Sequence, residues 1–387
     1  MNISENCVVY SKNSPFEAIL SAKEPLSKKN SSKETYHLVL NIRNSGIKYK
    51  PGDSVAIFPK NNPALVELII SALKASGEEP IVDPKLGVVY TLKEFLSTRA
   101  NLSRLTSSFL KVLYAHQLEG EASEKLQRLL AVENKEDLKI FLQQQHPIDA
   151  LKEFGGADLP LQEICSQFGP LLPRFYSISS SQSTHPDEIH LTVALYTFSA
   201  GDEKKFGVAS HFLCHLAKIE ETRIPIYIQP TVHFTLPDDT NAPIIMIGPG
   251  TGIAPFRAFL QERSSTQSPG ENWLFFGERN KSTDYFYENY FESLSEAGKL
   301  RVDLAFSRDQ EKKIYVQHKM WERKEELWCW LKKGAYLFVC GDAQRMAKDV
   351  EQTLLLISQE EGNLTEQEAK NFLKALKSEK KYRTDVY

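Results

Sequence analysis

The chain has 387 residues, 41% of them hydrophobic and 25% charged, with a formal net charge of −3. This length predicts two or three domains, the composition excludes a disordered chain, and the balanced charge argues against a general nucleic-acid-binding surface. The five cysteines are widely scattered and form no C-x-x-C pair, so we expect no disulfide framework, zinc site or iron–sulfur cluster. These cysteines are Cys7, Cys165, Cys214, Cys329 and Cys340.

The sequence carries no recognisable targeting or membrane segment. No apolar run approaches the roughly 20 residues that span a membrane. The first residues also lack the basic and apolar regions of a signal peptide. We therefore expect a cytoplasmic protein that does not associate with membranes.

Short stretches of alternating apolar and polar residues between positions 16 and 59 are typical of antiparallel strands and predict a small barrel. The same alternation resumes at Arg174 and returns near the end of this half of the chain. The barrel is therefore expected to be split between residues 1–61 and 169–238.

Between the two parts of the barrel, residues 62–168 have apolar residues at helical spacing and predict a helical insert. Thr91 and Glu94 have the spacing of a capping box at the start of one of its helices. His116 and His146 have no histidine partner at metal-ligand spacing, so we interpret them as ordinary histidines and expect no metal site.

In residues 239–387, buried strand patterns alternate with helices, which predicts a parallel sheet covered by helices. Its first strand runs into a turn that contains Gly248, Gly250 and Gly252, followed at once by a helix. The amide groups and positive end of such a helix can hold a phosphate, although an isolated triplet of this kind is equally compatible with a turn without a ligand. The overall fold class is thus α/β plus β.

A second glycine turn precedes a predicted helix, at Phe206 to Ser210, and places a hydroxyl at the expected N-cap. Together the two turns indicate two nucleotides. In the strand Arg174–Ser177, arginine can neutralise a pyrophosphate, tyrosine can lie against a flat ligand, and serine can bond a ring nitrogen. An ordinary strand with an exposed arginine would have the same residues.

Several donors follow the strand that ends near Phe306, at the sheet edge where α/β proteins bind ligands. Arg308 and Lys313 outweigh the nearby acid Asp309, which favours a nucleotide with a 2′-phosphate over one with a free ribose hydroxyl. A solvated charged loop is the alternative interpretation. Cys340 closes the fourth predicted strand of this sheet, where a thiol could help to place a nicotinamide.

In combination these patterns resemble the ferredoxin-NADP reductase superfamily, and within it the diflavin-reductase branch that includes the flavoproteins of NADPH-sulfite reductases. The run of motifs, in the same order, covers almost the whole chain. The matching stretches include RFYSISSSQ at 174–182, GVAS at 207–210, IIMIGPGTGIAPFRAFLQER at 244–263, SRDQ at 307–310, KIYVQ at 313–317, CGDAQRMAKDVEQ at 340–352 and the final DVY.

The resemblance implies two cofactors, FAD and NADP. It assigns FAD to the barrel, with contacts from Arg174, Phe175, Tyr176, Ser177, Thr192, Val193, Ala194, Phe198, Gly207, Val208, Ala209, Ser210 and Tyr387. It assigns NADP to the parallel-sheet domain, with contacts from Gly250, Thr251, Ser307, Arg308, Lys313, Ile314, Tyr315, Val316, Gln317 and Asp349.

The resemblance also gives catalytic roles to Ser177, Cys340, Asp385 and Tyr387, which match residues that assist hydride transfer or stack on the flavin in relatives. Phe198 departs from the family pattern, which has tyrosine there, and removes one polar contact with the flavin.

The resemblance predicts an FAD-dependent reductase that oxidises NADPH. Because no FMN domain precedes residue 1 in this chain, we expect electrons to pass from FAD to a separate acceptor. The candidates are the haemoprotein of sulfite reductase, a flavodoxin or a ferredoxin. A free-standing flavodoxin or ferredoxin reductase and a non-catalytic nucleotide-binding module are the alternatives.

Overall fold

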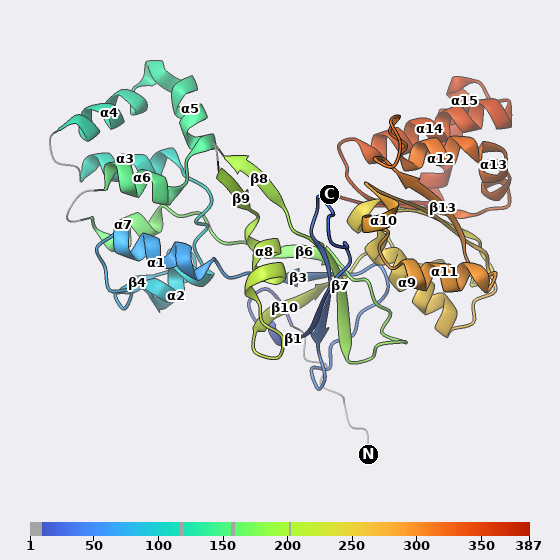
Figure 1. The fold of residues 1–387 in the computed structure, drawn as a ribbon, viewed down its shortest axis with the longest axis horizontal. Coiled ribbons are helices and arrows are strands. Elements are labelled where there is room, and N and C mark those ends of the chain that lie inside the picture. Colours follow the sequence, from blue (N-terminus) through green and yellow to red (C-terminus); the bar gives the residue numbers. More distant parts are fainter. Residues whose placement is uncertain (1–9, 117–119, 156–158, 201–202) are drawn as a thin grey trace. The chain divides into compact units, whose positions relative to one another are not determined.

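The computed structural model describes residues 10–116, 120–155, 159–200 and 203–387 (Figure 1). Its contacts divide the chain into two compact units. The first unit contains Met1–Ala56, Phe175–Ala194 and Lys218–Tyr387, and the second contains Ile57–Arg174 and Leu195–Ala217.

One sheet of six strands is assembled from both sides of the helical insert, with the strand order β6-β3-β10-β1-β2-β7. In this sheet β1 pairs antiparallel with both β10 and β2, and β2 pairs antiparallel with β7. The predicted antiparallel sheet from two separate segments is therefore confirmed. Its strands are β1 (Phe16–Pro25), β2 (Thr35–Asn41), β3 (Ser54–Ile57), β6 (Arg174–Ser177), β7 (Glu188–Ala194) and β10 (Arg223–Gln229).

Helices form between residues 62 and 168, as the apolar spacing predicts, and so does the capping box. Thr91 Oγ1 accepts from the amide of Glu94 at 3.2 Å, and the Glu94 carboxylate accepts from the amide of Thr91 at 3.1 Å. The helices are α1 (Pro63–Ala72), α2 (Leu92–Thr98), α3 (Ser107–Ala115), α4 (Glu121–Leu130), α5 (Lys135–Gln144), α6 (Pro147–Phe154) and α7 (Leu161–Ser166).

Two short hairpins in the second unit were not predicted. One pairs β4 (Pro80–Val82) with β5 (Val89–Thr91), and the other pairs β8 (Thr197–Ala200) with β9 (Glu203–Phe206). Strands of three or four residues carry too few alternating positions to be distinguished from loops. The β8–β9 hairpin is followed by α8 (Val208–His211) and a π-helical turn, η2 (Phe212–Leu216).

The parallel sheet predicted for the last third of the chain is confirmed. Its strand order is β13-β12-β11-β14-β15, and every neighbouring pair is parallel. The final strand was not predicted, because it consists of the last few residues of the chain. The strands are β11 (Ile244–Ile247), β12 (Asn272–Glu278), β13 (Arg301–Phe306), β14 (Tyr336–Gly341) and β15 (Tyr382–Val386).

Helices cover both faces of this sheet (Figure 1). The side chains of β11 alternate between the faces: Ile245 and Ile247 join one core cluster, and Ile244 and Met246 join the other. The first cluster includes residues of α12 (Val316–Glu322), α13 (Lys324–Lys332), α14 (Met346–Gly362) and α15 (Glu366–Ser378), and the second includes residues of α9 (Ala254–Ser265) and α11 (Glu288–Glu296). Helices α12 and α13 are separated at Arg323, whose backbone is not helical.

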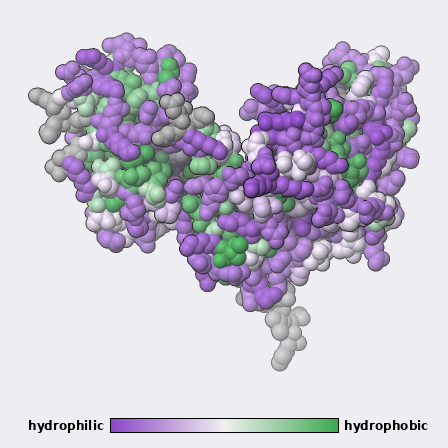
Figure 2. All heavy atoms as spheres, viewed as in Figure 1, coloured by the Kyte–Doolittle hydropathy of each residue, from purple (hydrophilic) through white to green (hydrophobic). Residues whose placement is uncertain are grey.

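The surface view in Figure 2 shows hydrophilic side chains over most of the face presented. In the part of the chain that the structure describes, no helix has both the length and the apolar character needed to cross a membrane. Cys165, Cys214, Cys329 and Cys340 are free cysteines, and Cys7 lies outside the described residues.

The turn before β3 supplies a test of the packing in the first unit. Gly52 has φ +101°, and a Cβ atom there would lie 1.8 Å from the carbonyl oxygen of Phe234. Replacing Gly52 with alanine is expected to destabilise the protein by about 3 kcal/mol, because the main chain must move as well as adopt a strained φ. Thermal unfolding measures the effect.

Gly46 is the matched control, because its φ is +73° and a Cβ atom there would meet nothing within 4 Å. Gly46→Ala should therefore cost only about 1 kcal/mol, from the backbone conformation alone. Equal losses in the two variants would show that the contact with Phe234 is unimportant.

Candidate functional site

The carboxylate of Asp385 lies between two other side chains that the sequence analysis selected. Ser177 Oγ donates to Asp385 Oδ2 at 2.8 Å, and Cys340 Sγ lies 3.8 Å from the same oxygen. Three of the four predicted catalytic residues are thus brought together from β6, β14 and β15.

The register of the parallel sheet places two of these residues side by side. Because β14 and β15 pair in parallel with Cys340 opposite Asp385, both side chains leave the sheet on the same face. Cys340 is completely buried, and this burial, reinforced by the nearby Asp385, raises the pKa of its thiol well above the ordinary value. The thiol therefore stays protonated at neutral pH.

The fourth predicted catalytic residue, Tyr387, lies beside the glycine turn. Its hydroxyl is 2.9 Å from Thr251 Oγ1, and its amide donates to the carbonyl of Gly341 at 3.1 Å. The residue is nevertheless 64% exposed. The end of the chain is thus fixed through its main chain and its hydroxyl, while the ring remains accessible to a flat ligand.

The glycine turn has the predicted strand–turn–helix form, with a short 3-10 segment, η3 (Gly250–Ile253), before α9. A Cβ atom at Gly252 would lie 2.2 Å from the carbonyl oxygen of Cys340, so this position admits no side chain. Gly250 has φ +60°, and a Cβ atom there would approach only the carboxylate of Glu278, at 3.2 Å. The turn at Gly250 therefore leaves room for a ligand against the backbone.

Part of the predicted adenosine-binding set lines a cavity of about 630 Å³. Lys313, Ile314, Gln317 and Asp349 all contribute to its wall, and Gln317 Nε2 donates to Asp349 at 3.1 Å. Trp321, Leu356 and His318 add aromatic and apolar surface that the sequence analysis did not select. The donors and flat apolar surfaces together suit a nucleotide.

The other predicted residues of this set lie outside the lining of the cavity. Arg308 and Tyr315 are exposed, and Ser307 donates from its amide to the carbonyl of Glu278 at 2.9 Å. Val316, the first residue of α12, is 2% exposed and packs in the core, so only its main chain is available to a ligand. Exposed cationic side chains such as Arg308 and Lys313 fit an anionic group.

The residues predicted for FAD in the first unit differ in their exposure. Phe175 is 52% exposed and lies edge-on to Tyr227, whereas Tyr176 and Ser177 are half-buried. Val193 is fully buried. The hydroxyl of Thr192 lies 2.6 Å from that of Tyr287, a residue of the parallel-sheet part. Ala194 ends β7 and is half-buried.

The second glycine turn differs from its prediction. Gly207, not a hydroxyl residue, is the N-cap of α8, and the helix begins at Val208. Ser210 Oγ instead accepts from the amide of Tyr196 and donates to the carbonyl of Gly207, both at 3.1 Å. The prediction was wrong because the helix starts earlier than its apolar pattern indicates. Ala209 is buried in this turn.

Phe198 and Arg174 also belong to the second unit. The ring of Phe198 stacks on that of His146, with centroids 6.5 Å apart. Arg174 is exposed at the start of β6.

A histidine cluster at the start of β7 was missed by the sequence analysis. His185, Glu188 and His190 present ligand atoms within 4.8 Å of one another, a group that could hold a metal ion. The spacing H-x-x-E-x-H is its signal in the sequence. In each histidine, one ring nitrogen faces Glu188 and the other, the outer nitrogen, faces away from it. The hydrogen bonds to the outer nitrogens distinguish a metal site from a hydrogen-bonded network.

Each outer nitrogen of the two histidines accepts a hydrogen bond. Arg257 Nη1, which can only donate, lies 3.3 Å from His190 Nδ1. Gln261 accepts from the amide of Ser181 through its oxygen, so its nitrogen donates to His185 Nε2 at 3.3 Å. In neutral rings the other two nitrogens then carry hydrogens toward Glu188, and the pattern favours a hydrogen-bonded network over metal ligation.

Burial keeps the histidine rings of this network neutral. The pKa of His190 and that of His37 are each lowered to about 3, chiefly by burial and secondarily by the charge of Arg257. His37 Nδ1 lies 3.0 Å from the hydroxyl of Tyr287. The cluster thus connects the six-stranded sheet to helix α9 and to the residue before α11.

Two family models match this chain, each over a different segment. The family model described as "FAD binding domain" matches residues 9–212, and the model described as "Oxidoreductase NAD-binding domain" matches residues 246–352.

Similar proteins bear the name sulfite reductase [NADPH] flavoprotein alpha-component. The one from Bacillus subtilis is 40% identical over 379 residues, which is 98% of this chain and 62% of that protein. Those from Zymomonas mobilis and Aliivibrio fischeri are 39% and 38% identical, each over 98% of this chain and 61% of their own length. The chain spans about three fifths of the length of these relatives.

The neutral histidine cluster predicts a dependence of stability on pH. Unfolded histidine binds protons below about pH 6.5, whereas buried His190 and His37 do so only near pH 3. Stability is therefore lost as the pH falls below 6.5, by about 2 kcal/mol for each residue at pH 5. His190→Gln should remove about half of this loss, measured by denaturant unfolding at pH 7 and pH 5.

His116→Gln is the control, because His116 lies on the second unit outside this cluster. It is expected to retain the pH dependence of the unchanged protein. A wild-type pH dependence in His190→Gln would contradict the assignment.

Proposed function

Since the chain belongs to the family of FAD-binding domains and also carries an oxidoreductase NAD-binding domain, we propose that it is an FAD-dependent reductase that oxidises NADPH. The FAD site is assigned to residues 1–61 and 169–238, and the NADP site to residues 239–387, with residues 62–168 as the connecting insert. The six-stranded sheet would then be a barrel, which the bridge between Ile178 and Leu191 supports by linking the end of β6 to β7.

The shared contacts of Asp385 support this proposal most directly. Ser177 belongs to the segment matched by the FAD family model, and Cys340 belongs to the segment matched by the NAD family model. Both side chains approach the same oxygen of Asp385. Polar groups from the two nucleotide-binding segments are thus within contact distance, as transfer between two bound cofactors requires.

The bound cofactors supply the hydride-transfer chemistry, and the protein supplies orientation and electrostatics. Asp385 orients the hydroxyl of Ser177 and places a negative charge beside the protonated thiol of Cys340. Tyr387 is assigned as the ring that covers the flavin, because it is exposed and attached next to Thr251. Movement of this ring would admit the nicotinamide.

The preference for NADPH is assigned to cationic residues beyond β13. Arg308 and Lys313 are exposed and can pair with a 2′-phosphate, and Ser307 lies beside them. NADH lacks that phosphate and forms no such pairs.

We further propose that electrons leave FAD for a separate protein. The relatives are named as the alpha-component of a sulfite reductase, which favours the haemoprotein of that enzyme as the acceptor. A flavodoxin or a ferredoxin is the alternative acceptor. The protein would then connect NADPH oxidation to a one-electron carrier or to sulfite reduction.

The purified protein should be yellow and should oxidise NADPH faster than NADH with ferricyanide as acceptor. Changing Arg308 to alanine removes a pair with the 2′-phosphate, worth about 2 kcal/mol and hence roughly thirtyfold in kcat/KM for NADPH. The kcat/KM for NADH should be nearly unchanged. Steady-state kinetics with both nucleotides measures the ratio, and an unaltered preference would contradict the assignment of Arg308.

The acceptor can be identified by anaerobic mixing. The protein is first reduced with NADPH and then mixed separately with a sulfite reductase haemoprotein, a flavodoxin or a ferredoxin. Reoxidation of the flavin, followed by its absorbance, should be fastest with the haemoprotein. Faster reaction with a flavodoxin or ferredoxin would replace the sulfite assignment with a role as a general carrier reductase.

A further inference from the structure

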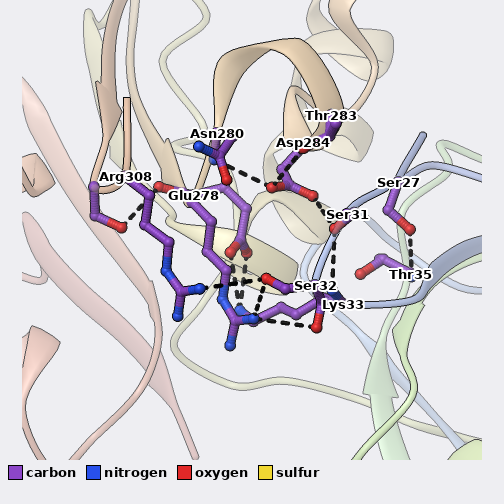
Figure 3. A network of polar contacts seen from close by, with 12 residues as sticks. Ser27, Ser31, Ser32, Lys33, Thr35, Glu278, Asn280, Thr283, Asp284 and Arg308 are labelled. Carbon is purple, nitrogen blue, oxygen red and sulfur yellow. Dashed lines mark hydrogen bonds and ion pairs between the residues drawn. The ribbon is translucent and has the colours of Figure 1, made fainter. Parts of the chain in front are cut away.

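The loop between β1 and β2, residues 26–34, contacts the parallel-sheet part of the first unit through polar side chains (Figure 3). The ammonium of Lys28 lies 2.9 Å from the carboxylate of Glu288. Ser31 Oγ donates to Asp284 at 2.5 Å. This 26–34 loop therefore has a defined position beside the residues that follow β12.

The ion pair of Lys33 is more enclosed than that of Lys28. Its ammonium lies 2.9 and 3.1 Å from the two carboxylate oxygens of Glu278, the last residue of β12. The side chain of Glu278 is only 5% exposed, whereas that of Lys33 is 38% exposed. A carboxylate that is so little hydrated depends on its partner, because burial of an unpaired charge is costly.

Glu278 also lies against the glycine turn. A Cβ atom at Gly250 would be 3.2 Å from Glu278 Oε2, so the carboxylate lies beside the backbone assigned to the NADPH pyrophosphate. Two negative groups at such short range repel each other strongly where water is scarce. Without a counter-charge, Glu278 would oppose phosphate binding at this turn.

We propose that Lys33, on the 26–34 loop, is a positioning residue of the nicotinamide nucleotide site, because it neutralises Glu278 beside the pyrophosphate turn. The inference rests on the proposed function, which places a dinucleotide at Gly250. Lys33 acts through Glu278 and does not need to touch the nucleotide. Its effect therefore falls on nucleotide binding, and the rate of the bound complex is unaffected.

A second contact of the same loop separates this role from 2′-phosphate recognition (Figure 3). Ser32 Oγ accepts from Arg279 at 2.5 Å and lies 3.5 Å from a guanidinium nitrogen of Arg308. Arg308 is assigned to the 2′-phosphate, which only NADPH carries. The pyrophosphate is common to NADPH and NADH, so loss of Lys33 should weaken both nucleotides equally.

The test uses the FAD-loaded protein with Lys33→Gln, Glu278→Gln and the double variant. Lys33→Gln should raise KM for NADPH and for NADH by about tenfold each, with kcat retained. It should weaken binding of NADP⁺ and NAD⁺ by the same factor in calorimetry. In the double variant the unpaired carboxylate is gone, so both KM values should return to within about twofold of the original.

Lys28→Gln is the matched control, because it removes the same charge from the same loop and breaks the ion pair with Glu288. It should leave both KM values unchanged. FAD content and melting temperature, measured for every variant, report any general loss of structure.

An unchanged KM in Lys33→Gln would overturn the proposal. Failure of Glu278→Gln to rescue Lys33→Gln would also overturn it, because Lys33 would then act by shaping the loop. A change for NADPH alone would reassign Lys33 to the 2′-phosphate. Absence of NADPH oxidation by the unchanged protein would instead contradict the proposed function itself.

Discussion

The parallel pairing of β15 with β14 is the constraint on which the candidate site depends. This pairing holds Asp385, almost at the end of the chain, where its Oδ2 lies 2.8 Å from the Oγ of Ser177 on a different sheet. The same pairing extends to Tyr387, whose amide bonds Gly341 and whose hydroxyl meets Thr251. Main-chain hydrogen bonds, which are regular and directional, therefore position side chains that are distant in sequence.

Polar groups join the two sheets of the first unit. Thr192 and His37 both contact the hydroxyl of Tyr287, and Arg257 donates to the carbonyl of Ser179 at 2.7 Å. Buried polar contacts contribute less net stability than apolar packing, but they require specific geometry. Such an interface suits a protein in which two bound rings must be held in register, because a small slide would leave buried donors without acceptors.

The sequence predicted those elements whose residues repeat a pattern over many positions. The buried runs of β11, β12 and β14 and the insert helices were found this way. Patterns failed where the determinant was not local. The strand β15 is defined by its partner, the cap of α8 by where the helix begins, and the His185–His190 cluster by contacts with Arg257 on another element. The relation of Lys33 to Glu278 spans 245 positions and has no sequence signal of its own.

Gly252 shows why the glycine turn and the Asp385 contacts form a single structural unit. Its missing side chain lets the turn approach the carbonyl of Cys340, where a Cβ atom would be only 2.2 Å away. The side chain of this same residue, Cys340, contacts Asp385. A shift of the turn would therefore displace the end of β14 and the strand β15 that pairs with it. The backbone at Gly250 and the polar group at Ser177 are linked through this main-chain packing, which the chain achieves with one glycine and no additional side chain.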